Sequence, residues 1–290
     1  MDLSLIQGYQ GMRALMERID TIANNVANVD TTGFKARETT FGEILYQQLP
    51  NQPGGEQANA NGRITPEQIR IGSGIITTGT PIRFTQGTRK ETGIETDLMI
   101  EGEGFFRVRK DENQNGNLND DPIYYTRAGR FTRSPGADGN DYLVTPTGEF
   151  LLDEFDNPVA IAAGNRFRVE RDGTLVQIFP DGHEEPNYER IAVYSIPNLQ
   201  EMGHLGNNLW AYPVQQQARQ APPPAGQAPL LLNDAPERFA IHQGALEASN
   251  VDLTKEMTSL IESERHLQLT SRSLQMTDQM LGLANEMARR

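Results

Sequence analysis

The chain has 290 residues, a formal net charge of -13 and no cysteine. The acidic balance disfavours nucleic acid and anionic lipid as partners, because their phosphates repel a negatively charged surface. Without cysteine the chain forms no disulfide and no thiolate metal site, and it holds no run of about 18 apolar residues that would insert into a membrane.

Residues 1–28 carry apolar side chains at alternating intervals of four and three. This spacing predicts a helix with a heptad seam rather than a broad amphipathic face. The seam consists of Leu5, Tyr9, Met12, Met16, Ile19, Ala23 and Val26.

Two segments have the composition of linkers. Residues 50–62 are rich in Asn, Gln, Gly and Pro, and residues 215–229 contain a Gln run and three consecutive prolines. We expect both segments to be irregular connections rather than helices or strands.

The chain between the linkers predicts many short strands, over residues of about 70–212. Aromatic and β-branched residues fill these runs, as strands prefer. Asp138-Gly139, Asp172-Gly173 and Asp181-Gly182 are dipeptides that favour tight hairpin turns. We therefore predict an antiparallel β-rich domain.

Residues 253–287 predict a second helix, preceded by a capping signal at residues 249–252. It carries a second apolar series beside the first, and a single partner helix would leave one of them exposed. We expect further copies of the chain to cover it, and an intramolecular helical hairpin is the alternative. The first series is Leu253, Leu260, Leu267, Leu274 and Leu281, and the second is Leu269, Met276 and Leu283.

These patterns predict an α+β fold, in which terminal helices of the coiled-coil type lie together and accompany a central antiparallel β-rich domain. We expect an N-terminal helical segment over 1–40 and an extended segment with a linker over 41–69. The β-rich domain should cover 70–242 and the C-terminal helical segment 243–290.

The chain lacks the residue patterns of common catalytic and metal sites. Its four histidines are scattered, without an H-x-x-x-H pair, and no G-x-S-x-G motif occurs. Residues 111–121 begin like a calcium loop, but position 12 is Pro122 instead of the bidentate Glu. We favour a hairpin tip there, and we expect no catalytic residue, no metal and no cofactor.

Three motifs closely resemble the signatures of flagellar rod and hook proteins. The N-terminal one is ANNVANVDTTGFK at residues 23–35, and the C-terminal one is GALEASNVD at 244–252 with TDQML at 277–281. The internal one is TDLMIEGEGFF at 96–106 with YTRAGRF at 125–131.

Within that family the chain most resembles the distal rod protein, because of its length and of the segment 41–53 after the first helix. The resemblance implies a non-enzymatic subunit of the flagellar basal body, outside the cytoplasmic membrane, in the periplasm or cell wall. Its partners would be itself, other rod and hook subunits and the flagellar type III export apparatus. The alternatives are a proximal rod or hook-type protein, a rod-associated peptidoglycan hydrolase, and a secreted coiled-coil adhesin or chaperone.

Asn24 and Asn28 lie four residues apart and hence on one helix face. Since an asparagine inside a helical contact sets register, we expect them to fix the stagger between neighbouring subunits; a solvated polar face is the alternative. Gly33 fits a left-handed helix stop. The expected assembly interface comprises Leu5, Tyr9, Met12, Met16, Ile19, Asn24, Asn28, Gly33, Leu253, Leu260, Leu267, Leu274 and Leu281.

Overall fold

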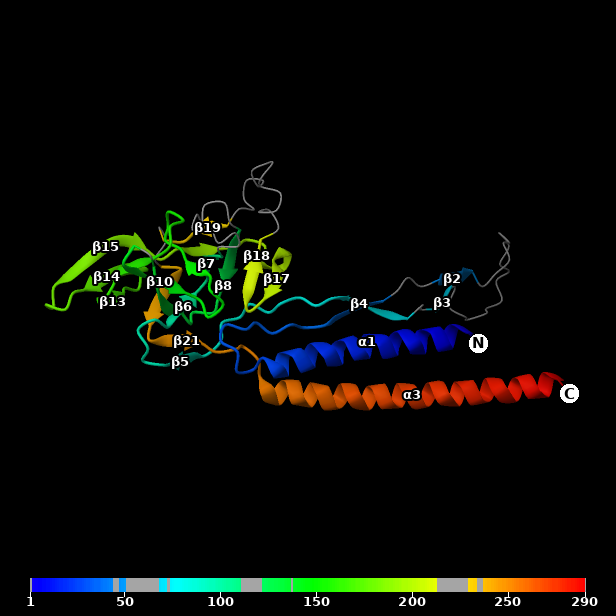
Figure 1. Ribbon diagram of the computed structural model, residues 1–290. Coiled ribbons are helices and arrows are strands. Elements are labelled where there is room, and N and C mark those ends of the chain that lie inside the picture. Colours follow the sequence, from blue (N-terminus) through cyan, green and yellow to red (C-terminus); the bar gives the residue numbers. More distant parts are fainter. Residues whose placement is uncertain are drawn as a thin grey trace. The chain divides into compact units, whose positions relative to one another are not determined.

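The computed structural model describes most of the chain (Figure 1). It covers residues 2–289 except for 44–46, 51–67, 72–73, 111–121, 137, 213–228 and 234–236. Both predicted linkers, apart from their edges, and the calcium-like loop therefore lie outside the described residues.

The chain forms two compact units, each assembled from segments that are distant in sequence. The helical unit consists of Met1–Val26, Arg37–Pro81 and Leu253–Arg290. The β-rich unit consists of Ala27–Ala36 and Ile82–Asp252. Residues 27–36 and 243–252, which border the terminal helices in sequence, thus belong to the β-rich unit.

Two helices dominate the helical unit: α1 (Asp2–Ala27) and α3 (Leu253–Arg289). Their bounds confirm the two predicted terminal helices. They run side by side with the N- and C-termini at the same end, so they are antiparallel (Figure 1). A Cβ placed on Gly8 of α1 would lie 2.6 Å from Cδ2 of Leu274 on α3, so the missing side chain lets the helices approach closely.

Two antiparallel strand pairs complete the helical unit. β1 (Thr40–Glu43) pairs with β4 (Ile75–Gly79), and β2 (Gln47–Pro50) pairs with β3 (Gln68–Ile71). Asn25 fixes the start of this region, because its side chain donates to the carbonyl of Arg37 at 2.8 Å and accepts from the Arg37 amide at 3.0 Å.

The β-rich unit contains the predicted antiparallel strands from residue 82 on, most of them in one ten-stranded sheet, whereas β4 of the predicted region lies in the helical unit. The path of that sheet is β12-β10-β11-β7-β8-β18-β17, with β9, β16 and β19 attached to it. Its strands are β7 (Phe105–Arg109), β8 (Ile123–Thr126), β9 (Thr132–Pro135), β10 (Asn140–Val144), β11 (Phe150–Leu151), β12 (Ala160–Ala162), β16 (Val193–Ser195), β17 (Gly203–Gly206), β18 (Leu209–Ala211) and β19 (Leu230–Leu231).

Three smaller sheets join strands across the β-rich unit. β13 (Arg166–Val169), β14 (Thr174–Ile178) and β15 (Glu184–Arg190) form an antiparallel meander. Two late strands pair with two early ones: β20 (Phe239–Gln243) with β6 (Leu98–Gly102), and β21 (Ala245–Glu247) with β5 (Arg89–Glu91). The C-terminal part of the chain is thus needed to complete the early strands.

The hairpin turns lie where the sequence predicts them. Gly139, Gly173 and Gly182 follow an aspartate between consecutive strands and have φ angles of 77°, 88° and 82°. Such left-handed conformations favour glycine because it lacks a Cβ. A core of buried aliphatic and aromatic side chains, including Phe106, Phe131 and Phe167, fills the space behind these strands.

Candidate functional site

The three signature motifs meet at one buried ion cluster in the β-rich unit. Lys35 closes the N-terminal motif, Arg127 belongs to the internal motif, and Glu247 belongs to the C-terminal motif. Their side chains are only 2%, 5% and 1% exposed. Burying a charge is costly unless it is paired and hydrogen-bonded, so the arrangement of partners decides whether this cluster stabilises the fold.

Glu247 is the centre of the cluster, because each of its carboxylate oxygens has its own cation. Lys35 Nζ lies 2.7 Å from Oε1, and Arg127 Nε lies 2.6 Å from Oε2. The Gly87 amide also donates to Oε1 at 2.8 Å. One anion between two cations leaves the cluster with an excess positive charge.

The two cations and one anion shift the pKa values of Glu247 and Lys35. Burial would raise the pKa of Glu247, but Arg127 and Lys35 outweigh it and lower this pKa below its ordinary value of 4.5. Burial lowers the pKa of the Lys35 ammonium from its ordinary 10.5, because Glu247 opposes the shift only in part and Arg127 repels the second cation.

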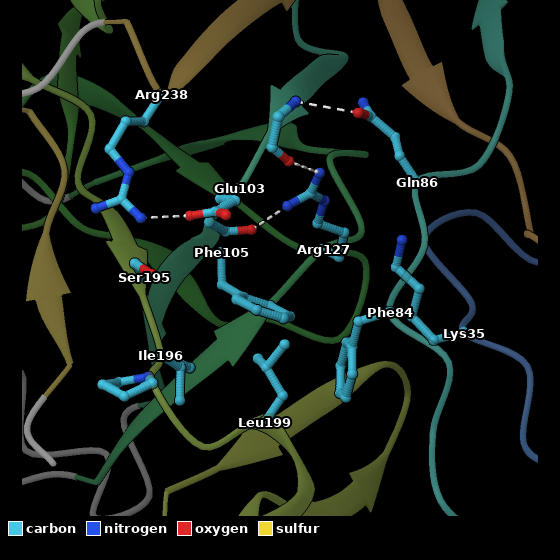
Figure 2. Close-up of a pocket in the computed structure, with 13 residues that line it drawn as sticks. Lys35, Phe84, Gln86, Glu103, Phe105, Arg127, Ser195, Ile196, Leu199 and Arg238 are labelled. Carbon is cyan, nitrogen blue, oxygen red and sulfur yellow. Dashed lines mark hydrogen bonds and ion pairs between the residues drawn. The ribbon is translucent and has the colours of Figure 1, made fainter.

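The other N–H groups of the Arg127 guanidinium donate to backbone carbonyls of the internal motif. Its guanidinium donates to the carbonyls of Ile100 (3.1 Å), Gly102 (2.6 Å) and Gly104. Figure 2 shows the Arg127 guanidinium with dashed lines to two of these carbonyls, in the turn between β6 and β7. The residue therefore joins that turn to the C-terminal motif.

Asn250 makes a second link between the motifs. Its Oδ1 accepts from the Ala36 amide at 2.7 Å, and its Nδ2 donates to the carbonyls of Arg83 (2.6 Å) and Thr85 (3.0 Å). The Lys35 ammonium donates to the same Thr85 carbonyl at 3.0 Å. The N- and C-terminal signatures thus both donate hydrogen bonds to the backbone of the segment 83–85.

Gly33 has the predicted left-handed conformation, but it is not a helix stop. Its φ is +71°, whereas α1 already ends at Ala27. Gly33 instead lies in a tight approach, because a Cβ there would come within 2.7 Å of the Ala128 backbone nitrogen. The Gly33 amide donates to the Glu247 carbonyl at 2.8 Å, so Gly33 belongs to the same junction.

Replacing Gly33 by Ala is expected to destabilise the β-rich unit by more than about 2 kcal/mol, since a left-handed penalty and a backbone clash add. Gly139→Ala is the matched control, because Gly139 has a similar φ of +77° and no heavy atom near its Cβ position. The control should cost only about 1 kcal/mol. If urea denaturation gave equal losses of unfolding free energy for the two variants, the close approach at Gly33 would add nothing to the cost of the substitution.

The predicted asparagine pair has a buried neighbour that the sequence did not single out. Asn24 is exposed and Asn28 is half-buried, with its Oδ1 accepting from the Thr31 hydroxyl at 3.2 Å. Asn25 is 1% exposed and holds Arg37. The local constraint on the chain after α1 therefore comes from Asn25, and Asn24 faces solvent in the single chain.

The two leucine series of α3 lie in different environments. Leu260, Leu267, Leu274 and Leu281 are half-buried, whereas Leu253 is 43% exposed. The second series begins two residues after Leu267, about 200° further round the helix, and therefore faces away from α1. Its members Leu269, Met276 and Leu283 are 61%, 61% and 60% exposed.

The predicted seam of α1 also contains both half-buried and exposed side chains. Leu5, Met12, Ile19 and Val26 are half-buried, but Tyr9 and Met16 are 63% and 49% exposed and Ala23 is exposed. The most buried side chains of α1 are those of Ala14, Ile22 and Asn25, outside that seam. Each terminal helix thus keeps an apolar face that the single chain leaves in water.

Sequence reasoning placed Lys35, Arg127 and Glu247 inside the motifs but gave them no role. The signal that could have indicated the cluster is that the N-terminal motif carries a cation, Lys35, and the C-terminal motif an anion, Glu247. Within the described part of the chain, no group of three or more His, Asp or Glu side chains has the spacing to hold a metal ion. None of the described helices is long and apolar enough to cross a membrane.

Three family models match segments of the chain. They are the models for the flagella basal body rod protein (residues 8–35), the flagellar hook protein FlgE/F/G D1 domain (99–183) and the flagellar basal body rod FlgEFG protein C-terminal region (242–287). These matches contain all three charged residues of the buried cluster.

Full-length relatives agree with the family models. The chain is 32% identical over 287 residues to the flagellar hook-basal body complex protein FlhP of Bacillus subtilis, covering 97% of this chain and 98% of that protein. It is 30% identical to the flagellar basal-body rod proteins FlgG of Agrobacterium fabrum (95% of each chain) and Borreliella burgdorferi (96% of each chain).

Proposed function

The chain belongs to the family of flagellar basal-body rod and hook proteins, and from that premise we propose that it is a structural subunit of the rod. It polymerises through its terminal helices into the axial drive shaft. The exposed second series of α3 carries this proposal, because an apolar stripe along so long a helix is costly to leave in water.

The assembly surface combines residues that the single chain exposes with residues that it half-buries. The exposed series of α3 and the α1 side chains Tyr9 and Met16 would contact neighbouring subunits directly. The half-buried leucines of α3 would hold the helices together within one subunit. Several exposed side chains are methionines, whose flexibility suits the unequal contacts of a helical polymer. The surface comprises Leu5, Tyr9, Met12, Met16, Ile19, Asn24, Asn28, Leu253, Leu260, Leu267, Leu274 and Leu281, extended by Leu269, Met276 and Leu283. Gly33, also expected at the interface from the sequence, is buried in the β-rich unit and belongs to the junction with Glu247 instead.

We assign the subunit to the distal rod rather than to the proximal rod or the hook. The matches to FlgG proteins over nearly the whole of both chains support this assignment. The other rod and hook subunits would be its neighbours, and the type III export apparatus would deliver it outside the cytoplasmic membrane. The role is structural rather than enzymatic; a zymogram on cell wall without hydrolysis is the expected result.

Replacing Asn24 and Asn28 together by Ala is expected to give short or irregular polymers, because the amides set the stagger between subunits. The monomer should lose no more than about 1 kcal/mol, since Asn24 is exposed and the half-buried Asn28 gives up its hydrogen bond with the Thr31 hydroxyl. Asn25→Ala is the contrasting variant, and it should lower monomer stability by about 1–3 kcal/mol by leaving the Arg37 backbone unpaired. Polymers of normal length from the double variant would refute the register role.

Purified chain should form tubes of constant diameter at high concentration, visible by negative-stain electron microscopy. A deletion strain should have basal bodies without the distal shaft. A soluble chain that stays monomeric at every concentration, together with intact rods in the deletion strain, would contradict the proposed function.

A further inference from the structure

An exposed aromatic side chain lies on an ordered backbone turn between β11 and β12. Phe155 is 69% exposed, yet the turn that carries it is built around a buried carboxylate. Asp153 is 1% exposed and accepts from the amides of Phe155 (2.9 Å) and Asn157 (2.6 Å). The backbone that carries the exposed ring is therefore held by a polar group inside the fold.

The residue after Phe155 adds a second constraint. Asp156 has a φ of 68°, a left-handed conformation that costs energy for any residue but glycine. The side chain of Arg107 on β7 forms an ion pair with Asp156. A turn ordered in advance loses little entropy on binding, which is how a rigid aromatic residue contributes most to an interface.

A pocket that could accept an aromatic side chain lies elsewhere in the β-rich unit. It has a volume of about 560 Å³, within the range of cavities that accept a side chain or a small ligand. Figure 2 shows Phe84, Phe105, Ile196 and Leu199 gathered on one side of it. The opposite side carries charged groups, with Arg238 at 2.7 Å from Glu103.

The charges of the pocket complement those of the Phe155 turn. Lys35, Arg127 and Arg238 line the pocket, and Glu103 and Glu247 neutralise only two of these three cations. Phe155 is flanked by two acids, Glu154 and Asp156. Asp156 is already paired with Arg107, so Glu154 supplies the negative charge beside the ring, and the excess positive charge of the pocket lies with Lys35 and Arg127 in its wall, since Arg238 and Glu103 pair with each other. An aromatic ring beside a carboxylate suits an apolar pocket with a positively charged wall.

We propose that Phe155 of one copy of this chain occupies the Phe84–Leu199 pocket of another copy. The inference rests on the proposed polymerisation and adds a second contact to that of the terminal helices. Because the turn and the pocket are different surfaces, the contact is heterologous and propagates into an open helical polymer.

Phe155→Ala is expected to raise the critical concentration for polymerisation at least about tenfold, as the loss of a central aromatic anchor does. Its thermal melting should match that of the unmodified chain, because the ring buries little in the monomer. Leu205→Ala is the matched control, since Leu205 is similarly exposed (59%) and lies outside the pocket. Equal critical concentrations for both variants and the unmodified chain would overturn the proposal.

Cross-linking tests the pair directly, because the chain contains no cysteine. Chains carrying Phe155→Cys and chains carrying Ser195→Cys, which places a thiol in the pocket wall, are mixed, polymerised and treated with a short bifunctional thiol reagent. We expect dimers that contain one chain of each kind and are absent when either variant is treated alone. Polymers without these dimers would overturn the Phe155 contact and leave the rod function standing, whereas a failure of the unmodified chain to polymerise would count against both.

Discussion

A Glu247→Gln chain is expected to lose about 3–5 kcal/mol of stability in the β-rich unit, the cost of leaving buried charges without their partner. The substitution keeps the shape of the side chain but leaves Lys35 and Arg127 as two neighbouring buried cations. Urea denaturation of the full chain, followed by fluorescence, measures the loss. Trp210 is the single tryptophan and is buried in this unit, so its emission reports the β-rich unit.

Two control variants separate the buried cluster from general effects of charge. Lys35→Met leaves Glu247 paired with Arg127, so the loss should be smaller than that of Glu247→Gln. Glu184→Gln removes one partner of an ion pair with Arg168 whose side chains are about half exposed, and it should cost less than about 1 kcal/mol. A loss from Glu247→Gln no larger than that from Glu184→Gln would show that the cluster does not stabilise the fold.

Acid should weaken the unmodified chain in a way that depends on Glu247. The folded-state pKa of this group is lower than its ordinary value of 4.5. Its contribution is therefore fully present above the ordinary value and is lost as the pH falls through the lower, folded-state value. The difference in stability between the unmodified chain and Glu247→Gln should narrow below pH 4.5 in denaturation at stepped pH. A constant difference would contradict the lowered pKa.

The second large effect is expected on assembly rather than on folding. A chain with Met276→Glu and Leu283→Glu should fail to polymerise, with a critical concentration raised more than about 100-fold, because each new carboxylate would be buried unpaired between subunits. Both side chains are at least 60% exposed in the single chain, so the monomer should melt as the unmodified chain does. Sedimentation of polymer from monomer measures the effect.

Gln275→Glu is the matched control for this face. It adds a negative charge to α3 at an exposed position outside the apolar series, and polymerisation should remain within about threefold of normal, as for an exposed charge. If the double variant polymerised as well as this control, the exposed apolar face of α3 would not be the assembly surface.

Local patterns in the sequence were sufficient to predict the elements of the fold. Heptad spacing predicted both terminal helices, because a helix repeats its faces at short, regular intervals. Asp-Gly dipeptides predicted three hairpin turns, because few other residues tolerate a positive φ. These features depend on near neighbours, and they were confirmed at Leu253 and Gly139 among others.

The buried cluster could not be predicted in the same way, because it joins residues that are far apart. Lys35 and Glu247 are separated by 212 positions, and no periodicity relates them. Gly33 illustrates the same limit: its left-handed conformation followed from the sequence, but its packing against Ala128 depends on the tertiary fold. Likewise, nothing local distinguishes the buried Asn25 from the exposed Asn24.

Neighbouring subunits should complete the packing of the terminal helices, since each helix keeps an exposed apolar face in the single chain. Amide hydrogen exchange on the monomer and on the polymer tests this claim directly. In the monomer, amides over 5–26 and 253–285 should exchange faster than those of the β-rich core, and in the polymer the same amides should become protected. Full protection of both helices in a proven monomer, unchanged on assembly, would contradict it.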